Sequence, residues 1–271
     1  MLSETAITEL AETAKRAALA GGAALMDWRG RFSAREKGPS DFVTDADLAS
    51  QAAVEQVIRA EHPDHAFVGE EDAAFDRPDD DQLCWVCDPL DGTTNYLHGF
   101  PCFAVSVGVT LGGELLAGAV FDPMSGEHFW AGRGRGAWLN DEPIRTSATQ
   151  QLSDALVALS LPASVQPDSP DLVDLMTLIG RCQAIRRTGS AALNLAYVAC
   201  GRLDVHWARQ IKPWDVAAGV LLVREAGGVV SSASGGEFDL WRADFQAAAT
   251  EPLHAEMAAV LARNAAASDR S

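Results

Sequence analysis

The stretch Asp88-Pro89-Leu90-Asp91-Gly92-Thr93-Thr94 decides most about the fold and chemistry of this 271-residue chain. It follows directly on the apolar run Leu83–Cys87, which predicts a buried strand. Carboxylates and a glycine turn at the carboxyl end of a strand lie where open α/β sheets bind ligands. If the Pro-Leu step bends the chain, both carboxylates can converge on cations, while Gly92 lets backbone N–H groups approach an anion. For D-x-x-D alone, a plain polar turn is the alternative.

Three more acidic segments stand where a predicted strand ends or a predicted helix begins. They are Gly69-Glu70-Glu71 after the strand Ala66–Val68, Trp214-Asp215 before the helix Val216–Ala226, and Val43-Thr44-Asp45-Ala46-Asp47 at the start of a helix over Asp47–Ile58. Each also has an ordinary explanation, because aspartate at a helix start is usually an N-cap and acidic loops are usually solvated. The acids Asp72, Asp76 and Asp79–Asp81 are interpreted only as solvated surface.

The order of the predicted elements favours a layered mixed α/β architecture. Residues 3–26 predict a helix, Gly30–Pro39 a polar break, and Cys102–Leu111 with Glu114–Phe121 a hairpin that turns at Gly112-Gly113. From residue 156 onward short strands alternate with helices, and the last strand is expected at Ala247–Thr250. We therefore predict an N-terminal α+β half over 1–145 and a C-terminal α/β half over 146–271.

The charge balance excludes several classes of protein. Lys and Arg contribute 21 charges and Asp and Glu 38, so the net charge is −17. Such a chain repels nucleic acid and anionic membranes, and no run of about eighteen apolar residues could span a bilayer. The N-terminus lacks the apolar core of a secretory signal, and five cysteines make no disulfide framework. We expect a cytoplasmic protein that binds neither nucleic acid nor membrane, and its carboxylates suit hard divalent cations.

Two short motifs resemble a redox or zinc pair and a dinucleotide-binding loop, but each is better explained by ordinary structure. Cys84 and Cys87 form a C-x-x-C, but residues three apart on a strand point to opposite faces, so a core strand is favoured over a redox or zinc pair. Gly132-Arg133-Gly134-Arg135-Gly136 lacks the full dinucleotide-binding pattern and predicts a hairpin turn.

Taken together, these segments resemble the inositol monophosphatase family, within the lithium-sensitive, magnesium-dependent small-molecule phosphatases. The resemblance covers nearly the whole chain in order. Its segments are Lys37-Gly38, Val43-Thr44-x-x-Asp47, Gly69-Glu70-Glu71, Asp88 to Tyr96, His98-Gly99-Phe100-Pro101, Gly189-Ser190-Ala191-Ala192 and Trp214 to Gly219. It implies an αβαβα sandwich of the sugar-phosphatase type and a homodimer.

The resemblance also implies the roles of individual residues. The metal ligands would be Glu70, Asp88, the Leu90 carbonyl, Asp91 and Asp215, holding two or three Mg²⁺; Mn²⁺ would substitute, and Li⁺ and Ca²⁺ would inhibit. Glu70 and Thr93 would position the attacking water, and Asp47 would orient Thr93. The substrate would contact Leu90, Asp91, Gly92, Thr93, Gly189, Ser190, Ala191 and Asp215.

The implied reaction is the Mg²⁺-dependent hydrolysis of a small phosphomonoester, such as inositol-1-phosphate or a related polyol or sugar phosphate, by direct attack of a metal-activated water. Haloacid-dehalogenase-type phosphatases instead use D-x-D-x-T with an aspartate nucleophile. The acids here are three apart and Gly92 follows the second, which favours direct attack of water. A catalytically silent regulatory protein on the same scaffold is a second hypothesis.

One position departs from the family. Many members carry a substrate-binding Glu seven residues before the Trp-Asp aspartate, and that position here is Ala208; the nearest upstream acid is Asp204. Loss of a buried acceptor weakens polyol binding by about 1–3 kcal/mol. Histidinol phosphate and 3'(2'),5'-bisphosphate nucleotides therefore stay open as substrates. Arg209 and Lys212 could favour a second phosphate, or could simply be exposed.

Overall fold

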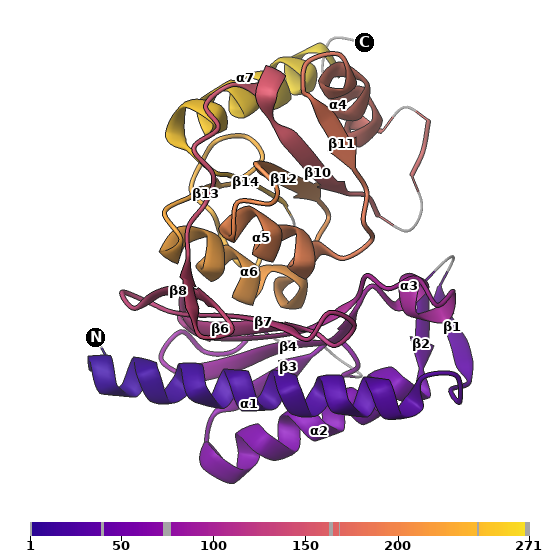
Figure 1. The fold of residues 1–271 in the computed structure, drawn as a ribbon, viewed down its shortest axis with the longest axis vertical. Helices are drawn as coiled ribbons and strands as arrows, with labels where there is room; N and C mark the ends of the chain where they lie inside the picture. Colours follow the sequence, from indigo (N-terminus) through magenta and orange to yellow (C-terminus); the bar gives the residue numbers. More distant parts are fainter. Residues whose placement is uncertain are drawn as a thin grey trace.

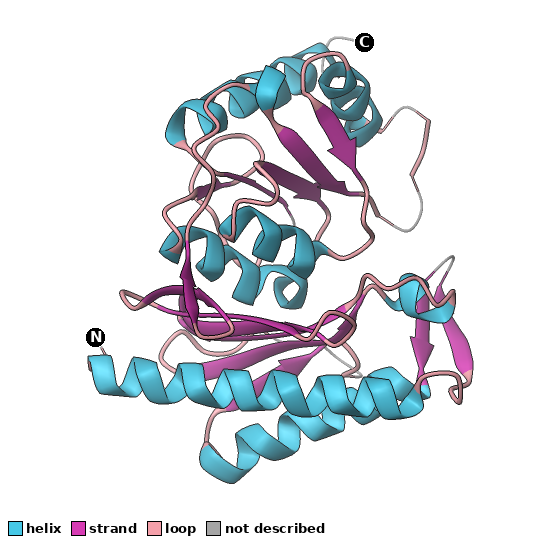
Figure 2. Ribbon diagram, viewed as in Figure 1, coloured by secondary structure: helices cyan, strands magenta, loops and turns pink. Residues whose placement is uncertain are grey.

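The chain forms five alternating layers of helices and sheets, which Figures 1 and 2 show from the N-terminal helices at one end to the C-terminal helix at the other. The computed structural model describes residues 2–38, 41–72, 77–162, 165–167, 169–242 and 244–268. The predicted αβαβα sandwich is thereby confirmed. None of the described helices combines the length and apolar character that crossing a bilayer requires.

The first sheet has seven strands in the order β3-β4-β5-β6-β7-β8-β9. They are β3 Ala66–Gly69, β4 Leu83–Asp91, β5 Ala104–Leu111, β6 Glu114–Asp122, β7 Glu127–Gly132, β8 Gly136–Leu139 and β9 Glu142–Ile144. Neighbours pair antiparallel except β3 and β4, which are parallel. The helices α1 Glu4–Trp28 and α2 Asp45–Glu61 cover its outer face. Both expected hairpin turns, at Gly112-Gly113 and at Gly132–Gly136, are present.

The cysteines of β4 confirm that this strand is part of the core. Cys84 packs among side chains facing α6, whereas Cys87 packs among those facing α1 and α2, so the two point to opposite faces. All five cysteines are free thiols. Burial raises the pKa of the Cys84 thiol to about 12, which leaves it unreactive at neutral pH.

The second sheet has five strands in the order β11-β10-β12-β14-β13. They are β10 Leu156–Ser160, β11 Ala184–Arg186, β12 Val205–Arg209, β13 Val229–Ser231 and β14 Asp244–Ala248. β10 pairs in parallel with both β11 and β12, while β14 pairs antiparallel with β12 and β13. The short helix η1 Leu152–Asp154 precedes β10, and α4 Pro170–Ile179 and α7 Glu251–Ser268 cover the outer face.

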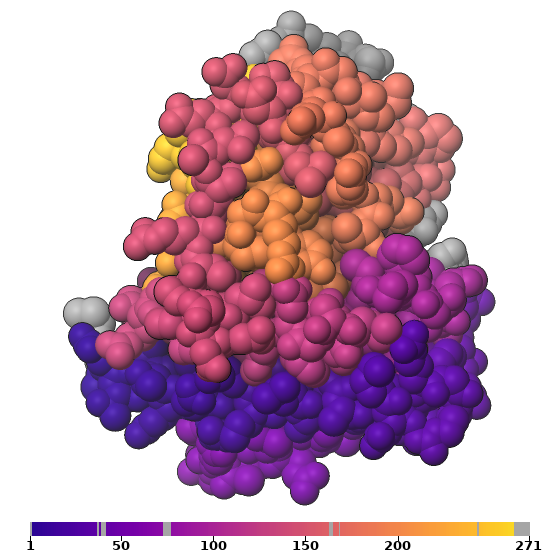
Figure 3. Space-filling model, viewed as in Figure 1, coloured from indigo at the N-terminus to yellow at the C-terminus, as the bar shows by residue number. Residues whose placement is uncertain are grey.

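The central layer joins the two sheets and consists of α5 Ala191–Ala199 and α6 Pro213–Glu225. Every residue of α6 from Val216 to Val223 is buried, because one side faces the seven-stranded sheet and the other the five-stranded sheet. Figure 3 shows the orange α5–α6 region resting directly on the magenta strands. The start of α6 is therefore fixed relative to both sheets.

Two expectations about local structure were wrong. The polar break expected over Gly30–Pro39 contains β1 Ala34–Gly38, which pairs antiparallel with β2 Asp41–Thr44 as a separate hairpin. The last strand begins three residues earlier than predicted and ends at Ala248, because its pairing with β12 sets its extent. Pro39 and Asp76 lie outside the described residues.

Candidate active site

A β-bulge in β4 brings two carboxylates of the Asp88–Asp91 segment to one place. Asp88 pairs with Ser106 of β5 and Asp91 with Ala104, so four residues of β4 face three of β5. The Leu90 N–H donates to Asp88 Oδ1 at 2.9 Å, which holds the bend. Together with Asp215, these aspartates place carboxylate oxygens within 4.8 Å of one another. An all-oxygen donor set of this kind fits a hard divalent cation such as Mg²⁺.

Asp91 is held by the beginning of α5. Its carboxylate accepts hydrogen bonds from the Ser190 hydroxyl at 2.5 Å, from the Ala192 N–H at 2.7 Å and from the Ala191 N–H at 3.2 Å. Ser190 is the N-cap of α5, and its hydroxyl also accepts from the Leu193 N–H. The positive N-terminal end of α5 therefore holds the carboxylate of Asp91, a residue of the seven-stranded sheet.

Asp215 lies in the first turn of α6, behind Pro213, and contributes to the same cluster. One of its oxygens accepts the Lys212 N–H at 2.9 Å. Asp215 thus helps to cap α6, and its carboxylate also lies in the acidic cluster. Because α6 is buried between the sheets, the position of its carboxylate is fixed by the packing of the whole helix.

Asp47 and Thr93 meet beside the cluster of Asp88, Asp91 and Asp215. Asp47 is fully buried, and its Oδ2 accepts from the Thr44 N–H at 2.8 Å and from the Thr44 hydroxyl at 2.5 Å. The Thr93 hydroxyl lies 3.4 Å from Asp47 Oδ1 and 3.1 Å from the Leu90 carbonyl oxygen. The structure therefore places Asp47 within hydrogen-bond distance of Thr93.

Glu70 approaches the cluster from β3. Its N–H donates to the Cys87 oxygen at 3.1 Å, which places it next to the end of β4. Its carboxylate is close enough to Asp88 to raise the pKa of that aspartate. Glu70 also lines a cavity that contains Asp215.

The buried, mutually repelling carboxylates of the cluster favour the binding of a cation. Burial, followed by the charges of Glu70, Asp91 and Asp215, raises the pKa of Asp88 well above its ordinary value. Burial and the Asp215 charge raise the pKa of Asp91 to about 7, and burial raises that of Asp47 to about 6. Carboxylates that repel one another in a dry site are stabilised when a divalent cation binds among them.

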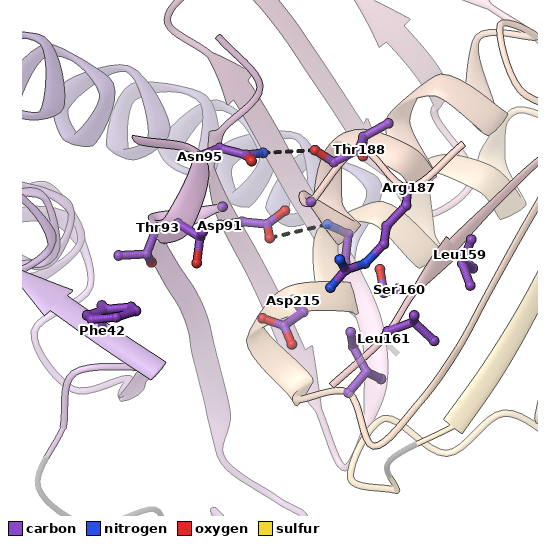
Figure 4. Close-up of a pocket in the computed structure, with 15 residues that line it drawn as sticks. Phe42, Asp91, Thr93, Asn95, Leu159, Ser160, Leu161, Arg187, Thr188 and Asp215 are labelled. Atoms are coloured by element: carbon purple, nitrogen blue, oxygen red, sulfur yellow. Dashed lines mark hydrogen bonds between the residues drawn. The ribbon is translucent and has the colours of Figure 1, made fainter. Parts of the chain in front are cut away.

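A cavity of about 350 Å³ opens beside the aspartates, and Figure 4 shows the side chains that line it. On one wall Gly92 adopts φ +100°, and a Cβ there would lie 2.9 Å from the Cys102 oxygen. The short helix α3 Thr93–Leu97 follows without a side-chain cap. The cavity wall thus presents a helix start whose first N–H groups have no capping side chain, an arrangement that suits a phosphate oxygen.

The side chain of Asn95 joins this wall to the opposite one. Its amide donates to the Cys102 oxygen at 2.6 Å and to the Thr188 oxygen at 2.8 Å. Gly189, next along the chain, has φ +89°, and a Cβ there would lie 2.7 Å from the Asn95 amide nitrogen. Glycine is therefore required at this contact.

The structure brings most of the predicted site residues together. Asp91, Gly92, Thr93, Gly189, Ala191 and Asp215 line the cavity. Ser190 is fully buried and bonded to Asp91 instead, and the Leu90 side chain is also buried, so Leu90 can contribute only its carbonyl. The metal, catalytic and substrate roles of these residues stay predictions.

Several cavity residues were not predicted, including Phe42, Leu159, Ser160, Leu161, Arg187 and Ile211. A signal for two of them was available, because short strands were expected to alternate with helices from residue 156 onward, and the carboxyl ends of parallel strands meet at one edge of a sheet. Ser160 ends β10 and Arg187 directly follows β11. Asp204 does not replace the missing Glu at position 208. Its carboxylate accepts from the Ser147 hydroxyl and the Leu156 N–H, at the other end of β12.

The sequence model of the inositol monophosphatase family matches residues 6–266. The inositol-1-monophosphatase of Rhizobium meliloti (strain 1021) is 43% identical over 74% of this chain and 75% of its own length. The Nus factor SuhB of Escherichia coli (strain K12) is 44% identical over 75% and 76%. The crystal structure of the extragenic suppressor protein suhB from Bartonella henselae has a TM-score of 0.87 at 36% identity, covering 93% and 98% of the two chains. The chain belongs to the inositol monophosphatase family.

Proposed function

We propose that this protein is a Mg²⁺-dependent phosphatase that hydrolyses a small phosphomonoester by direct attack of water on phosphorus. The observation that carries the proposal is the convergence of Asp88, Asp91 and Asp215, with oxygens within 4.8 Å, beside the uncapped start of α3. A dianionic phosphate needs cations, which these carboxylates would hold, and N–H donors, which the start of α3 would provide.

The chain's own residues have separable tasks in this reaction. Asp88, Asp91 and Asp215, with Glu70 and the Leu90 carbonyl, would hold the Mg²⁺ ions. When bound, Mg²⁺ supplies an acidified water and positive charge at the phosphate oxygens. The Thr93 hydroxyl donates to Asp47, so its oxygen accepts a hydrogen bond from the attacking water, and Glu70 accepts the proton of that water. The N–H groups at the start of α3 orient the phosphate for in-line attack.

Inositol-1-phosphate and related polyol or sugar phosphates are the first substrates to test, and the inositol-1-monophosphatase of Rhizobium meliloti supports this choice. Histidinol phosphate, fructose 1,6-bisphosphate and adenosine 3',5'-bisphosphate complete the panel. We expect orthophosphate release in Mg²⁺ that disappears in EDTA. Asp91→Asn should lower turnover about a thousandfold, because a lost metal ligand costs several kcal/mol of transition-state stabilisation. Full activity of this variant would overturn the site assignment.

The stereochemical course at phosphorus separates direct attack from a phosphoenzyme. The substrate is a phosphorothioate made chiral with ¹⁶O and ¹⁷O, and it is hydrolysed in ¹⁸O-water. Direct attack is a single in-line displacement and inverts the configuration, whereas an aspartyl-phosphate intermediate requires two displacements and retains it. The configuration of the product is read by ³¹P NMR, and retention would rule out the proposed mechanism.

The name Nus factor among the relatives favours a second candidate, a regulatory role without catalysis. Its test is the same panel, because a silent protein releases no phosphate from any member. The proposal further includes a homodimer and a cytoplasmic location, which light scattering on the purified protein and cell fractionation can test.

A further inference from the structure

The wall of the cavity opposite the phosphate side is built from the ends of three parallel strands. Ser160 ends β10, Arg187 directly follows β11, and Ala208 stands near the end of β12. Ser160 and Ala208 are paired in register, so their side chains share one face of the sheet. Ala208 is 0% exposed, carries only a methyl group and does not line the cavity. The position at which many family members have a carboxylate therefore contributes none here.

The buried side chain of His206 holds the Ser160 hydroxyl in place. Its hydroxyl lies 3.1 Å from Nε2 of His206, which stands two residues before Ala208 on the same face of β12. Asn194 of α5 lies 3.5 Å from the same nitrogen. Burial lowers the pKa of His206 to about 3, so the ring is neutral and adds no charge to the wall.

Arg187 supplies the charge that this wall does have. Figure 4 shows its side chain extending from the end of β11 into the cavity, on the side of Ser160 and Asp215. Among the residues that the structure describes, it forms no ion pair and no side-chain hydrogen bond. Its guanidinium therefore points into the cavity with its donors available.

The neighbouring arginines differ from Arg187 in this respect. Arg209 is paired with the buried carboxylate of Asp174 at 2.8 Å, with Asp171 also 3.8 Å away, so its charge is already balanced. Arg186 is exposed and donates to the Ile185 oxygen, and it does not line the cavity. The sequence suggested Arg209 and Lys212 as cations that could bind a second phosphate. Arg209 is ion-paired with Asp174 of α4. Lys212 is exposed and lines only the neighbouring cavity that contains Glu70.

We propose that Arg187 binds a second anionic group of the substrate, so that the preferred phosphomonoester carries a carboxylate or a second phosphate on its alcohol part. Guanidinium binds such groups through two parallel charge-assisted hydrogen bonds, which a neutral hydroxyl cannot match. Leu159, Leu161 and Ile211 line the same cavity, and Arg187 itself is exposed to solvent there. This inference rests on the proposed phosphatase activity.

Two pairs of substrates, each with one neutral group exchanged for an anionic group, test the inference on the purified full chain with Mg²⁺. Glycerol-3-phosphate and 3-phosphoglycerate exchange a hydroxymethyl for a carboxylate, and fructose 1-phosphate and fructose 1,6-bisphosphate exchange a hydroxyl for a phosphate. The measured quantity is the ratio of kcat/KM for the anionic member to that for the neutral member. The two pairs also distinguish a carboxylate from a phosphate as the preferred group.

We expect the native protein to prefer the anionic member of at least one pair. Arg187→Gln should lower that ratio about 10- to 100-fold, and Arg187→Lys by less, because lysine keeps the charge without the paired donors. Arg186→Gln is the matched control and should leave the ratio unchanged. A native ratio near one, or equal loss on both members in Arg187→Gln, would overturn the inference while the phosphatase proposal stands. If no substrate releases phosphate, the phosphatase proposal fails and this inference fails with it.

Discussion

The carboxylate of Asp91 accepts a 2.5 Å hydrogen bond from the hydroxyl of Ser190, although 99 residues separate them. Asp91 ends a strand of the seven-stranded sheet, and Ser190 caps a helix of the central layer. Most of the hydrogen bonds that hold this aspartate thus come from outside its own sheet. The position of a proposed metal ligand depends on how α5 docks against β4.

Ser190→Ala should therefore impair both stability and activity. It removes the helix cap and one bond to Asp91, so we expect a loss of about 1–2 kcal/mol in the free energy of unfolding and about tenfold in kcat. Urea denaturation and phosphate release measure the two effects. Ser3→Ala is the matched control, because Ser3 caps α1 through the Ala6 N–H away from the site. It should lower stability by a similar amount and leave kcat unchanged; a tenfold loss of kcat in both variants would contradict the positioning role.

Thr93→Ala should reduce kcat about 10²- to 10³-fold with little change in stability, because the hydroxyl beside Asp47 is partly exposed and would act on the attacking water. Thr93→Ser keeps the hydroxyl and should retain most of the activity. Steady-state phosphate release with circular dichroism checks both variants. If alanine and serine were equally impaired, the methyl group rather than the hydroxyl would be the important part.

Stability without metal should fall as pH rises through the range of the site carboxylates. The folded-state pKa of Asp91 is about 7 and that of Asp47 about 6, both above the ordinary 3.8. The folded protein then holds protons that the unfolded chain has released, so this contribution is complete below about pH 4 and is lost as pH rises through 6 to 7.

Mg²⁺ should reverse that loss, because it binds the ionised carboxylates. In EDTA we expect a lower Tm at pH 8 than at pH 5.5 from these groups, and a larger increase in Tm on adding Mg²⁺ at pH 8. Asp91→Asn should show a smaller difference between the two pH values. Equal increases at both pH values would mean that the ion does not compete with protons at this cluster.

Glu225 gives a prediction about stability away from the site. Its carboxylate accepts the Gly134 N–H at 2.8 Å and the Gly136 N–H at 2.9 Å, and so fastens the β7–β8 turn to α6. Glu225→Ala should cost about 1–3 kcal/mol in thermal or urea unfolding, since two charge-assisted bonds are lost, with kcat retained. Glu4, whose exposed carboxylate pairs with Arg135 of the same turn at 3.0 Å, is the control. Glu4→Ala should cost at most about 0.5 kcal/mol, and an equal cost for both would contradict this account.

Long elements with clear periodicity were predictable, as α1 and the β5–β6 hairpin show. The β1–β2 hairpin was not, because Ala34-Arg35-Glu36 has no apolar alternation and its strands are held mainly by each other's backbone. The start of β14 was also missed. Its run Phe245 to Ala249 is buried on both faces and shows no alternation of apolar and polar residues, so only the register with β12 defines where it begins.

Acidic residues of the site could be predicted because they follow strands or open helices in a recognisable order. Arg187 and Ser160 belong to no such motif, and their meeting depends on β10 lying between β11 and β12. The ion pair between Arg209 and Asp174 could not be predicted either, because it requires α4 to pack beside the end of β12. Sequence reasoning thus identified the acidic cluster and the Gly189–Ala191 segment, but not the wall that Ser160 and Arg187 form.

The buried position of α6 between the two sheets also has a consequence for how the protein matures. Asp215 enters the cluster only when this helix has docked on strands made more than a hundred residues earlier. A chain still emerging from the ribosome cannot complete the carboxylate set until this late segment has been synthesised and has packed. Acquisition of the ion would therefore mark the end of tertiary assembly, and metal uptake would report how many molecules in a preparation have finished folding.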